Sequence, residues 1–175
     1  MSSAPFGIAI HAPLDTSLKR ADMGGAKWDV LPPNPHPAFE TYYVQDAPIH
    51  GVVWVKAITP QYANDPYGTS LQNAFDRIVG QVASRYGKCN SVNTLRNGAI
   101  WDQSRDFVAS LFEGDRFYWN VWDREHHSNL PEDLESVFVG VLPHGHSDAS
   151  VIIEYTSVEL KSADEALNND LSNLL

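Results

Sequence analysis

The residues best suited to chemistry in this chain are its histidines. Four of the seven lie in two short acidic segments, WDREHHSNLPEDLE at 122–135 and PHGHSD at 143–148. Imidazole and carboxylate groups bind catalytic zinc ions, and they serve as general acids and bases in hydrolases. The two segments therefore raise two alternatives: a metal-assisted hydrolytic site, or two polar turns between strands.

The spacing of these histidines favours polar turns. His126 and His127 are adjacent, so an extended chain directs them to opposite sides. His144 and His146 are two apart, but the proline and glycine beside them interrupt any strand that would align them. The helical zinc motif, with histidines four residues apart and a glutamate between them, does not occur. A predicted strand at 136–142 separates the two segments by roughly 20 Å. We therefore predict no metal site and no cofactor.

Other catalytic templates fit no better. The sequence has neither the G-x-S-x-G elbow of serine hydrolases nor a glycine-rich nucleotide loop. Cys89 has no histidine beside it, which argues against a catalytic thiol. A glycosidase-like pair of carboxylates stays open, although nothing selects one pair among the acids near predicted turns. These acids are Asp102, Asp106, Glu113, Asp115 and Asp123.

A second group of residues suits the recognition of another protein. Trp, Tyr and Arg are the side chains that most often anchor protein interfaces. They gather in IWDQSRD at 100–106 and in FYWNVW at 117–122. The alternative is a loop whose tryptophan is buried and whose arginine pairs with an acid. The predicted binding residues are Trp101, Arg105, Tyr118, Trp119 and Trp122.

The composition is that of a globular protein, with 43 % hydrophobic and 19 % charged residues. A formal net charge of −10 and the lack of any Lys/Arg cluster disfavour nucleic-acid binding. The same charge suits solubility, or a protein partner with a basic surface. One cysteine excludes an intrachain disulfide.

The sequence shows no membrane or leader segment. No stretch approaches the ~20 apolar residues of a membrane helix. We expect a cytoplasmic protein if the chain is complete, and an exported one if a leader has been removed. The oligomeric state stays open.

The periodicity predicts one main helix over about 69–86. Thr69 and Gln72 have the spacing of a capping box, and Gly87 suits the C-terminal cap. Four apolar residues recur at helical intervals on one face: Leu71, Phe75, Ile78 and Val82.

Strand-like segments flank this helix. Residues 40–60 have the pattern of a hairpin, whereas the Gly- and Pro-rich residues 23–39 indicate a loop. After the helix we predict four strands: two in 105–123 around an EGD turn, and two in 135–160 around HGHSD. The predicted fold is α+β, an antiparallel sheet with one main helix followed by a four-strand meander. Residues 1–160 would form a single domain.

Residues 161–175 are predicted to form a C-terminal amphipathic helix or a frayed tail. Ser162 and Glu165 have capping-box spacing, and leucines follow on one face. Such a short helix is marginal alone, so it docks on its own domain, docks on a partner, or frays.

Four segments, PFGI, GVVWVKAI, YGTSLQNAFDRI…YG and IWDQSRDFVASLFEGDRFYWNVW, resemble a family of small bacterial proteins of unknown function. The resemblance covers most of residues 5–160. It implies an FG-led first strand, a Trp-containing hairpin, and a helix ending in YG before an antiparallel sheet. It implies no catalytic residues. In outline the fold is also similar to secreted inhibitor and lipoprotein-type domains.

The features together favour a non-enzymatic binding protein that recognises another protein. An inhibitor or immunity-type protein that captures a basic partner is one concrete form. The alternative is a hydrolytic enzyme of uncharacterised type, in its metal-assisted form using His144 and His146. A third hypothesis is an oligomer built through the C-terminal segment.

Overall fold

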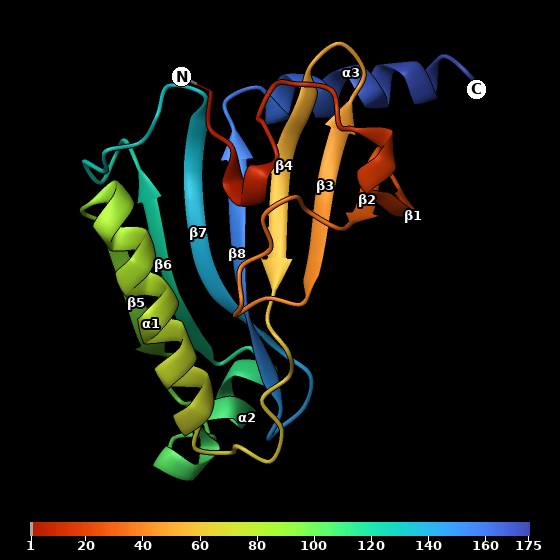
Figure 1. Cartoon of the computed structure of the whole chain (residues 1–175). Coiled ribbons are helices and arrows are strands. Elements are labelled where there is room, and N and C mark those ends of the chain that lie inside the picture. Colours follow the sequence, from red (N-terminus) through yellow and green to blue (C-terminus); the bar gives the residue numbers. More distant parts are fainter. Residues whose placement is uncertain (1) are drawn as a thin grey trace. The chain divides into compact units, whose positions relative to one another are not determined.

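The computed structural model describes residues 2–175. Within them the chain forms one antiparallel sheet of eight strands, three α-helices and three short 3-10 helices (Figure 1). The strands are β1 (Lys19–Gly24), β2 (Lys27–Val30), β3 (Thr41–Ala47), β4 (Gly51–Ile58), β5 (Asn90–Leu95), β6 (Arg116–Asp123), β7 (Leu134–Pro143) and β8 (Ala149–Ser157). The helices are η1 (Pro5–Gly7), η2 (Thr16–Leu18), α1 (Thr69–Tyr86), η3 (Ser104–Asp106), α2 (Phe107–Phe112) and α3 (Leu160–Ser172). The order in the sheet is β1-β2-β3-β4-β8-β7-β6-β5. The α+β class with an antiparallel sheet is therefore confirmed.

The chain divides into two compact units. Unit 1 comprises the described residues up to Ala57 together with 130–137 and 154–175, and unit 2 comprises 58–129 and 138–153. Unit 1 holds 13 of the 22 acidic residues but only 5 of the 12 lysines and arginines. It therefore carries most of the net negative charge. The predicted boundary at residue 160 stays a prediction.

The first hairpin of unit 1 was not expected from the sequence. β1 and β2 pair antiparallel, with Lys19 opposite Val30. β2 and the end of β1 fall within residues 23–39, which the sequence indicates as a loop. All but one residue of β1 are exposed, so it has no alternation of apolar and polar residues for sequence reasoning to detect. The expected first strand near residue 6 is also wrong, because Pro5–Gly7 form a 3-10 turn. The predicted hairpin at 40–60 is confirmed as β3 and β4.

The C-terminal helix α3 belongs to unit 1. Figure 1 shows it passing the end of β3 and the start of β4. Ala163 packs against Ala47 and Val53, and the Gln45 amide donates to Asp164 at 2.7 Å. Beyond this contact the helix is largely exposed, with Leu171 at 54 %. Its first turns are therefore docked and its last turns are not. Among the described residues, no helix has both the length and the apolar character needed to cross a bilayer.

In unit 2 the main helix α1 has the predicted bounds and buries the predicted stripe. The predicted capping box is wrong, because the Asp65 carboxylate accepts the backbone N–H of Thr69 (2.9 Å) and of Leu71 (3.0 Å) instead. Such a carboxylate satisfies free donors of the first turn and interacts favourably with the helix dipole. The ring of Phe75 then packs on Tyr118 of β6, with 4.3 Å between the centroids.

The four-strand meander is wrong, because the sheet is larger and its order differs. Residues 107–112 form the helix α2 rather than a strand, and β6 lies between β7 and β5 in the sheet. Phe107 to Leu111 are all buried, and a short run that is apolar throughout has no period to separate helix from strand. Gly114, with φ of +74°, follows the helix end. A glycine of this kind suits a helix terminus as well as a hairpin turn.

Candidate functional site

The residues most suited to recognition lie on unit 2 in a group that we call the Trp101 patch: Ile100, Trp101, Phe112, Glu113 and His146. The His146 ring makes edge-on contacts with two aromatic rings. The distance between ring centroids is 4.8 Å to Trp101 and 5.5 Å to Phe112. Its Nε2 is 2.6 Å from Glu113 Oε1. Ile100 and Phe112 are 79 % and 47 % exposed. The patch is therefore an ordered group of apolar side chains that reaches solvent.

Three separate segments build the Trp101 patch. The loop after β5 carries Ile100 and Trp101, and Arg96 at its start binds Asp115 at 2.6 Å. The end of α2 supplies Phe112 and Glu113. The turn between β7 and β8 supplies His146, and its ends are joined by a bond from the N–H of His144 to the C=O of Asp148 at 2.8 Å. These bonds hold each segment, so the patch is formed before any partner arrives.

The chemistry of the Trp101 patch is that of a contact surface. An exposed isoleucine in the loop that carries Trp101, together with two aromatic rings packed on His146, resembles the apolar centre of a protein interface, and charged groups at its rim give specificity. Asp102 is exposed, and the Glu113 side chain is 40 % exposed. The neighbouring charges are therefore partly acidic.

The other predicted binding residues lie elsewhere. Arg105 is exposed on η3, and its guanidinium forms no hydrogen bond or ion pair with the described residues. Tyr118 and Trp122 are buried; Trp122 donates to Gly87 O at 3.0 Å. Burial, with a smaller contribution from Asp76, raises the pKa of Tyr118. Partner contact with these two rings would require rearrangement, so we leave them out of the candidate surface.

Trp119 lies on the other face of β6 from Tyr118, because side chains alternate along a strand. Its ring contacts those of Phe117 (5.8 Å) and Phe138 (6.3 Å) and is half-buried. The sequence analysis grouped Trp119 with Trp101 as binding residues. In the structure no ring contact joins Trp119, Phe117 and Phe138 to the Trp101 patch.

Three of the four histidines in the acidic segments have separate surroundings. His126 Nδ1 binds Asp123 at 2.7 Å, and His144 Nε2 binds the Ser150 hydroxyl at 3.0 Å. His146 belongs to the Trp101 patch. Across residues 2–175, no three His, Cys, Asp or Glu side chains are grouped so that they could hold a metal ion.

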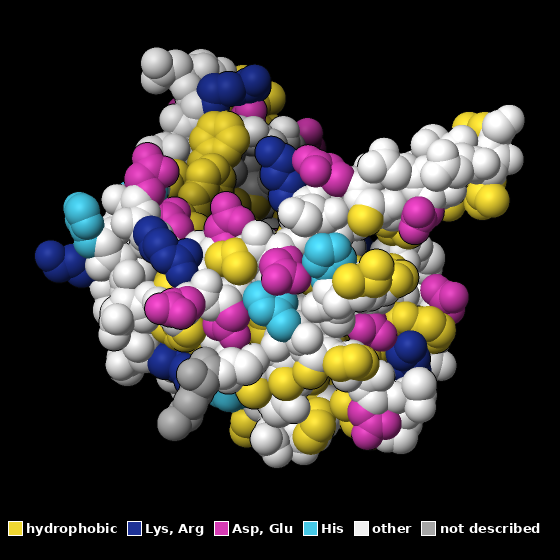
Figure 2. Space-filling view, turned by 90° about the horizontal axis from the view of Figure 1, so that it is seen from above, with side chains coloured by type: hydrophobic (Ala, Val, Ile, Leu, Met, Phe, Trp, Pro, Cys, Tyr) yellow, Lys and Arg dark blue, Asp and Glu magenta, His cyan; other side chains and the backbone are white. Residues whose placement is uncertain are grey.

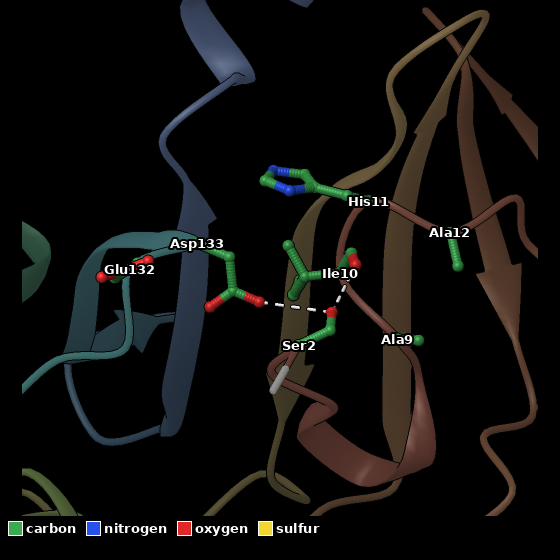
Figure 3. A pocket seen from close by; sticks show the side chains of 7 residues that line it. All are labelled: Ser2, Ala9, Ile10, His11, Ala12, Glu132 and Asp133. Carbon is green, nitrogen blue, oxygen red and sulfur yellow. Dashed lines mark hydrogen bonds between the residues drawn. The ribbon is translucent and has the colours of Figure 1, made fainter.

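Unit 1 contains a pocket that sequence reasoning missed. It has a volume of about 490 Å³ and is lined by Ser2, Ala9, Ile10, His11, Ala12, Glu132 and Asp133 (Figure 3). The Asp133 carboxylate accepts hydrogen bonds from Ser3 Oγ (2.6 Å), Ser3 N (2.5 Å) and Ser2 Oγ (3.3 Å). Partial burial alone would raise the pKa of Asp133, but these bonds outweigh it and the pKa is lowered. Asp133 thus fixes the N-terminal segment and remains ionised.

His11 enters this pocket from an uncommon backbone conformation, with φ of +64°. Its N–H donates to Val52 O, and Val52 N–H donates to Ala12 O, both at 2.9 Å. Gly51 allows this close approach, since a Cβ there would lie 2.7 Å from the Ala12 carbonyl. The imidazole Nε2 lies 2.5 Å from the hydroxyl of buried Ser157. Full burial makes Ser157 a group that positions His11 rather than an accessible nucleophile.

Beside this pair, His50 Nδ1 lies 3.0 Å from Glu159 Oε2. The bond to His50 is the largest cause that lowers the pKa of Glu159, and the charges of His11 and His50 add to it. Figure 2 shows histidine and acidic side chains side by side on the face that it draws. No local signal could reveal this grouping, because His11 and Ser157 are 146 residues apart in the chain.

Comparisons with protein-family models, with curated proteins and with solved structures found no match. The resemblance to small bacterial proteins therefore stays a prediction. The function has to be argued from the residues of this chain.

Proposed function

We propose that this protein is a non-enzymatic binding protein that recognises another protein through the Trp101 patch. The supporting observation is the patch itself: the rings of Trp101 and Phe112 both contact His146, and Ile100, which precedes Trp101 in the chain, is largely exposed. Burying such side chains in a complementary pocket is the main source of affinity at interface hot spots. A solitary exposed apolar residue needs no explanation, but an ordered cluster does.

The partner that fits is a protein with a basic rim around an apolar contact. Acidic groups border the patch, and the whole chain carries a net charge of −10. Complementary charge accelerates encounter and rejects acidic competitors. An inhibitor or immunity-type protein acting on a basic target is the concrete form of this proposal. The hydrolytic alternative has no comparable support, because His144 and His146 bind different neighbours.

The test is site-specific photo-crosslinking in an extract of the native cell. A photoreactive amino acid at Ile100 should yield one discrete crosslinked product with a protein of basic isoelectric point. The matched control carries the same group at Ile49, which is fully exposed on unit 1. Trp101→Ala in the Ile100-labelled protein should reduce the product at least tenfold while the fold is retained. Equal products from both positions, or a product that is insensitive to Trp101→Ala, would contradict the proposal.

A further inference from the structure

The pocket around His11 lies in unit 1 and is independent of the Trp101 patch. Its volume of about 490 Å³ falls within the range of roughly 300–1,000 Å³ that is usual for small-ligand sites. Apolar groups from Ala9, Ile10 and Ala12 line it, and polar groups come from Ser2, His11, Glu132 and Asp133. Figure 3 shows the Asp133 carboxylate turned toward the Ser2 hydroxyl, whereas the Glu132 carboxylate points away from it. The pocket thus combines apolar groups with one hydrogen-bonded carboxylate.

The charge of Asp133 is stabilised but not neutralised. All three of its donors, from Ser2 and Ser3, are uncharged. Among the described residues no Lys, Arg or His forms an ion pair with it, and no Lys or Arg lines the pocket. Neutral hydrogen bonds keep a carboxylate ionised without removing its charge. A cation that enters the pocket therefore gains a Coulomb attraction that no Lys, Arg or His of residues 2–175 already uses.

The imidazole of His11 is engaged by Ser157 rather than by Asp133. Its Nε2 lies 2.5 Å from the Ser157 hydroxyl, which also accepts the N–H of Glu159 at 3.0 Å. Among residues 2–175 no ion pair joins His11 to Asp133. The Asp133 carboxylate is therefore the group of this pocket that an entering cation would meet.

The geometry points to a binding site for an organic cation, whose ammonium or guanidinium group lies against Asp133 and whose carbon chain lies against Ala9 and Ala12. The negative charge of unit 1 concentrates cations near the pocket. The same chemistry occurs in free amines and in Lys or Arg side chains of a polypeptide. The site goes beyond protein recognition at the Trp101 patch and does not depend on it.

The experiment is an NMR titration of the ¹⁵N-labelled full chain with n-butylguanidinium and n-butylammonium chloride. Neutral n-butanol is the shape-matched control. We expect saturable shifts confined to the amides of residues 9–12 and 132–133, with butanol at least tenfold weaker. Asp133→Asn should weaken binding at least tenfold, whereas Glu165→Gln, which removes the same charge from the exposed surface of α3, should not.

A second variant keeps the test decisive if Asp133→Asn disturbs the N-terminal segment. Ala9→Leu should fill the pocket and block the cation while leaving Asp133 and its serine donors in place.

A blocked Gly-Arg-Gly peptide, with its citrulline counterpart as the uncharged control, shows whether the natural cation is a free amine or a side chain of a polypeptide. Tenfold tighter binding of the arginine peptide than of butylguanidinium assigns the site to a basic side chain, and equal binding assigns it to a free cation. Equal shifts with butanol, shifts spread over the whole surface, or no effect of either pocket variant would overturn the inference.

Discussion

At the scale of single residues, the informative side chains are those whose bonds connect distant parts of the chain. Asp133 binds residues 130 positions away at Ser3, and Ser157 binds His11 across 146 positions. Each fixes a segment that has little regular structure of its own. Local sequence patterns do not encode such contacts, which is why the histidine-rich segments attracted attention and His11 did not. Residue type alone likewise did not separate Trp101, at the surface, from Trp122, in the core.

The Asp133 bonds predict a pH-dependent contribution to stability. The pKa of Asp133 is lowered in the folded state, so its contribution is present above the unfolded value of about 3.9 and is lost as the pH falls below it. Asp133→Asn should lower the free energy of unfolding by about 1–3 kcal/mol at pH 7. Its effect should be much smaller at pH 3. Urea unfolding at the two pH values measures both, with Glu165→Gln as the control. An equal loss at both values would rule out a role for the ionised carboxylate.

At the scale of elements, prediction succeeded where the signal is local and periodic. The α1 stripe recurs over about three turns, so its bounds were recovered, and the alternating β3–β4 hairpin was recovered for the same reason. It failed for α2, in which five of the six residues are buried and no period appears, and for β1, which is largely exposed. The cap of α1 was misassigned because Asp65 reaches it from outside the helix.

The start of β4 offers a test of backbone packing. At Gly51, with φ of +70°, an added Cβ would lie 2.7 Å from the Ala12 carbonyl. Gly24 has φ of +78° but nothing within 4 Å of such a Cβ. Gly24→Ala should therefore cost only the left-handed strain of about 1–2 kcal/mol. Gly51→Ala should cost more and displace His11, which the NMR shifts of residues 11 and 157 would report. Equal unfolding free energies for the two variants would mean that the close approach contributes nothing.

At the scale of the whole molecule, the uneven charge is the dominant feature. Unit 1 carries 13 acidic and 5 basic residues, whereas unit 2 is close to balance, with 9 and 7. Like charges within a compact unit repel one another, and salt screens this repulsion. Composition established the total charge, but its distribution follows from the fold.

This distribution predicts a salt effect that is larger in unit 1. The screening length falls from about 30 Å at 0.01 M to about 8 Å at 0.15 M salt. Over this range the thermal midpoint should rise, and hydrogen-exchange protection should increase more in β3 than in β6. Potassium chloride should act like sodium chloride if screening is the cause. An equal gain in both strands would indicate a general salt effect instead.

The two ends of the strand order differ in how they resist unwanted association. β1 at one end is interrupted by register shifts and carries Lys19, Arg20 and Asp22, features that discourage a foreign strand from pairing. β5 at the other end keeps an unbroken register with β6, and its sequence NSVNTL contains no charged residue. Aggregation of the folded protein at high concentration would therefore begin along β5. A lysine at Thr94, an exposed position in the middle of that edge, is the substitution that would give it the protection β1 already has.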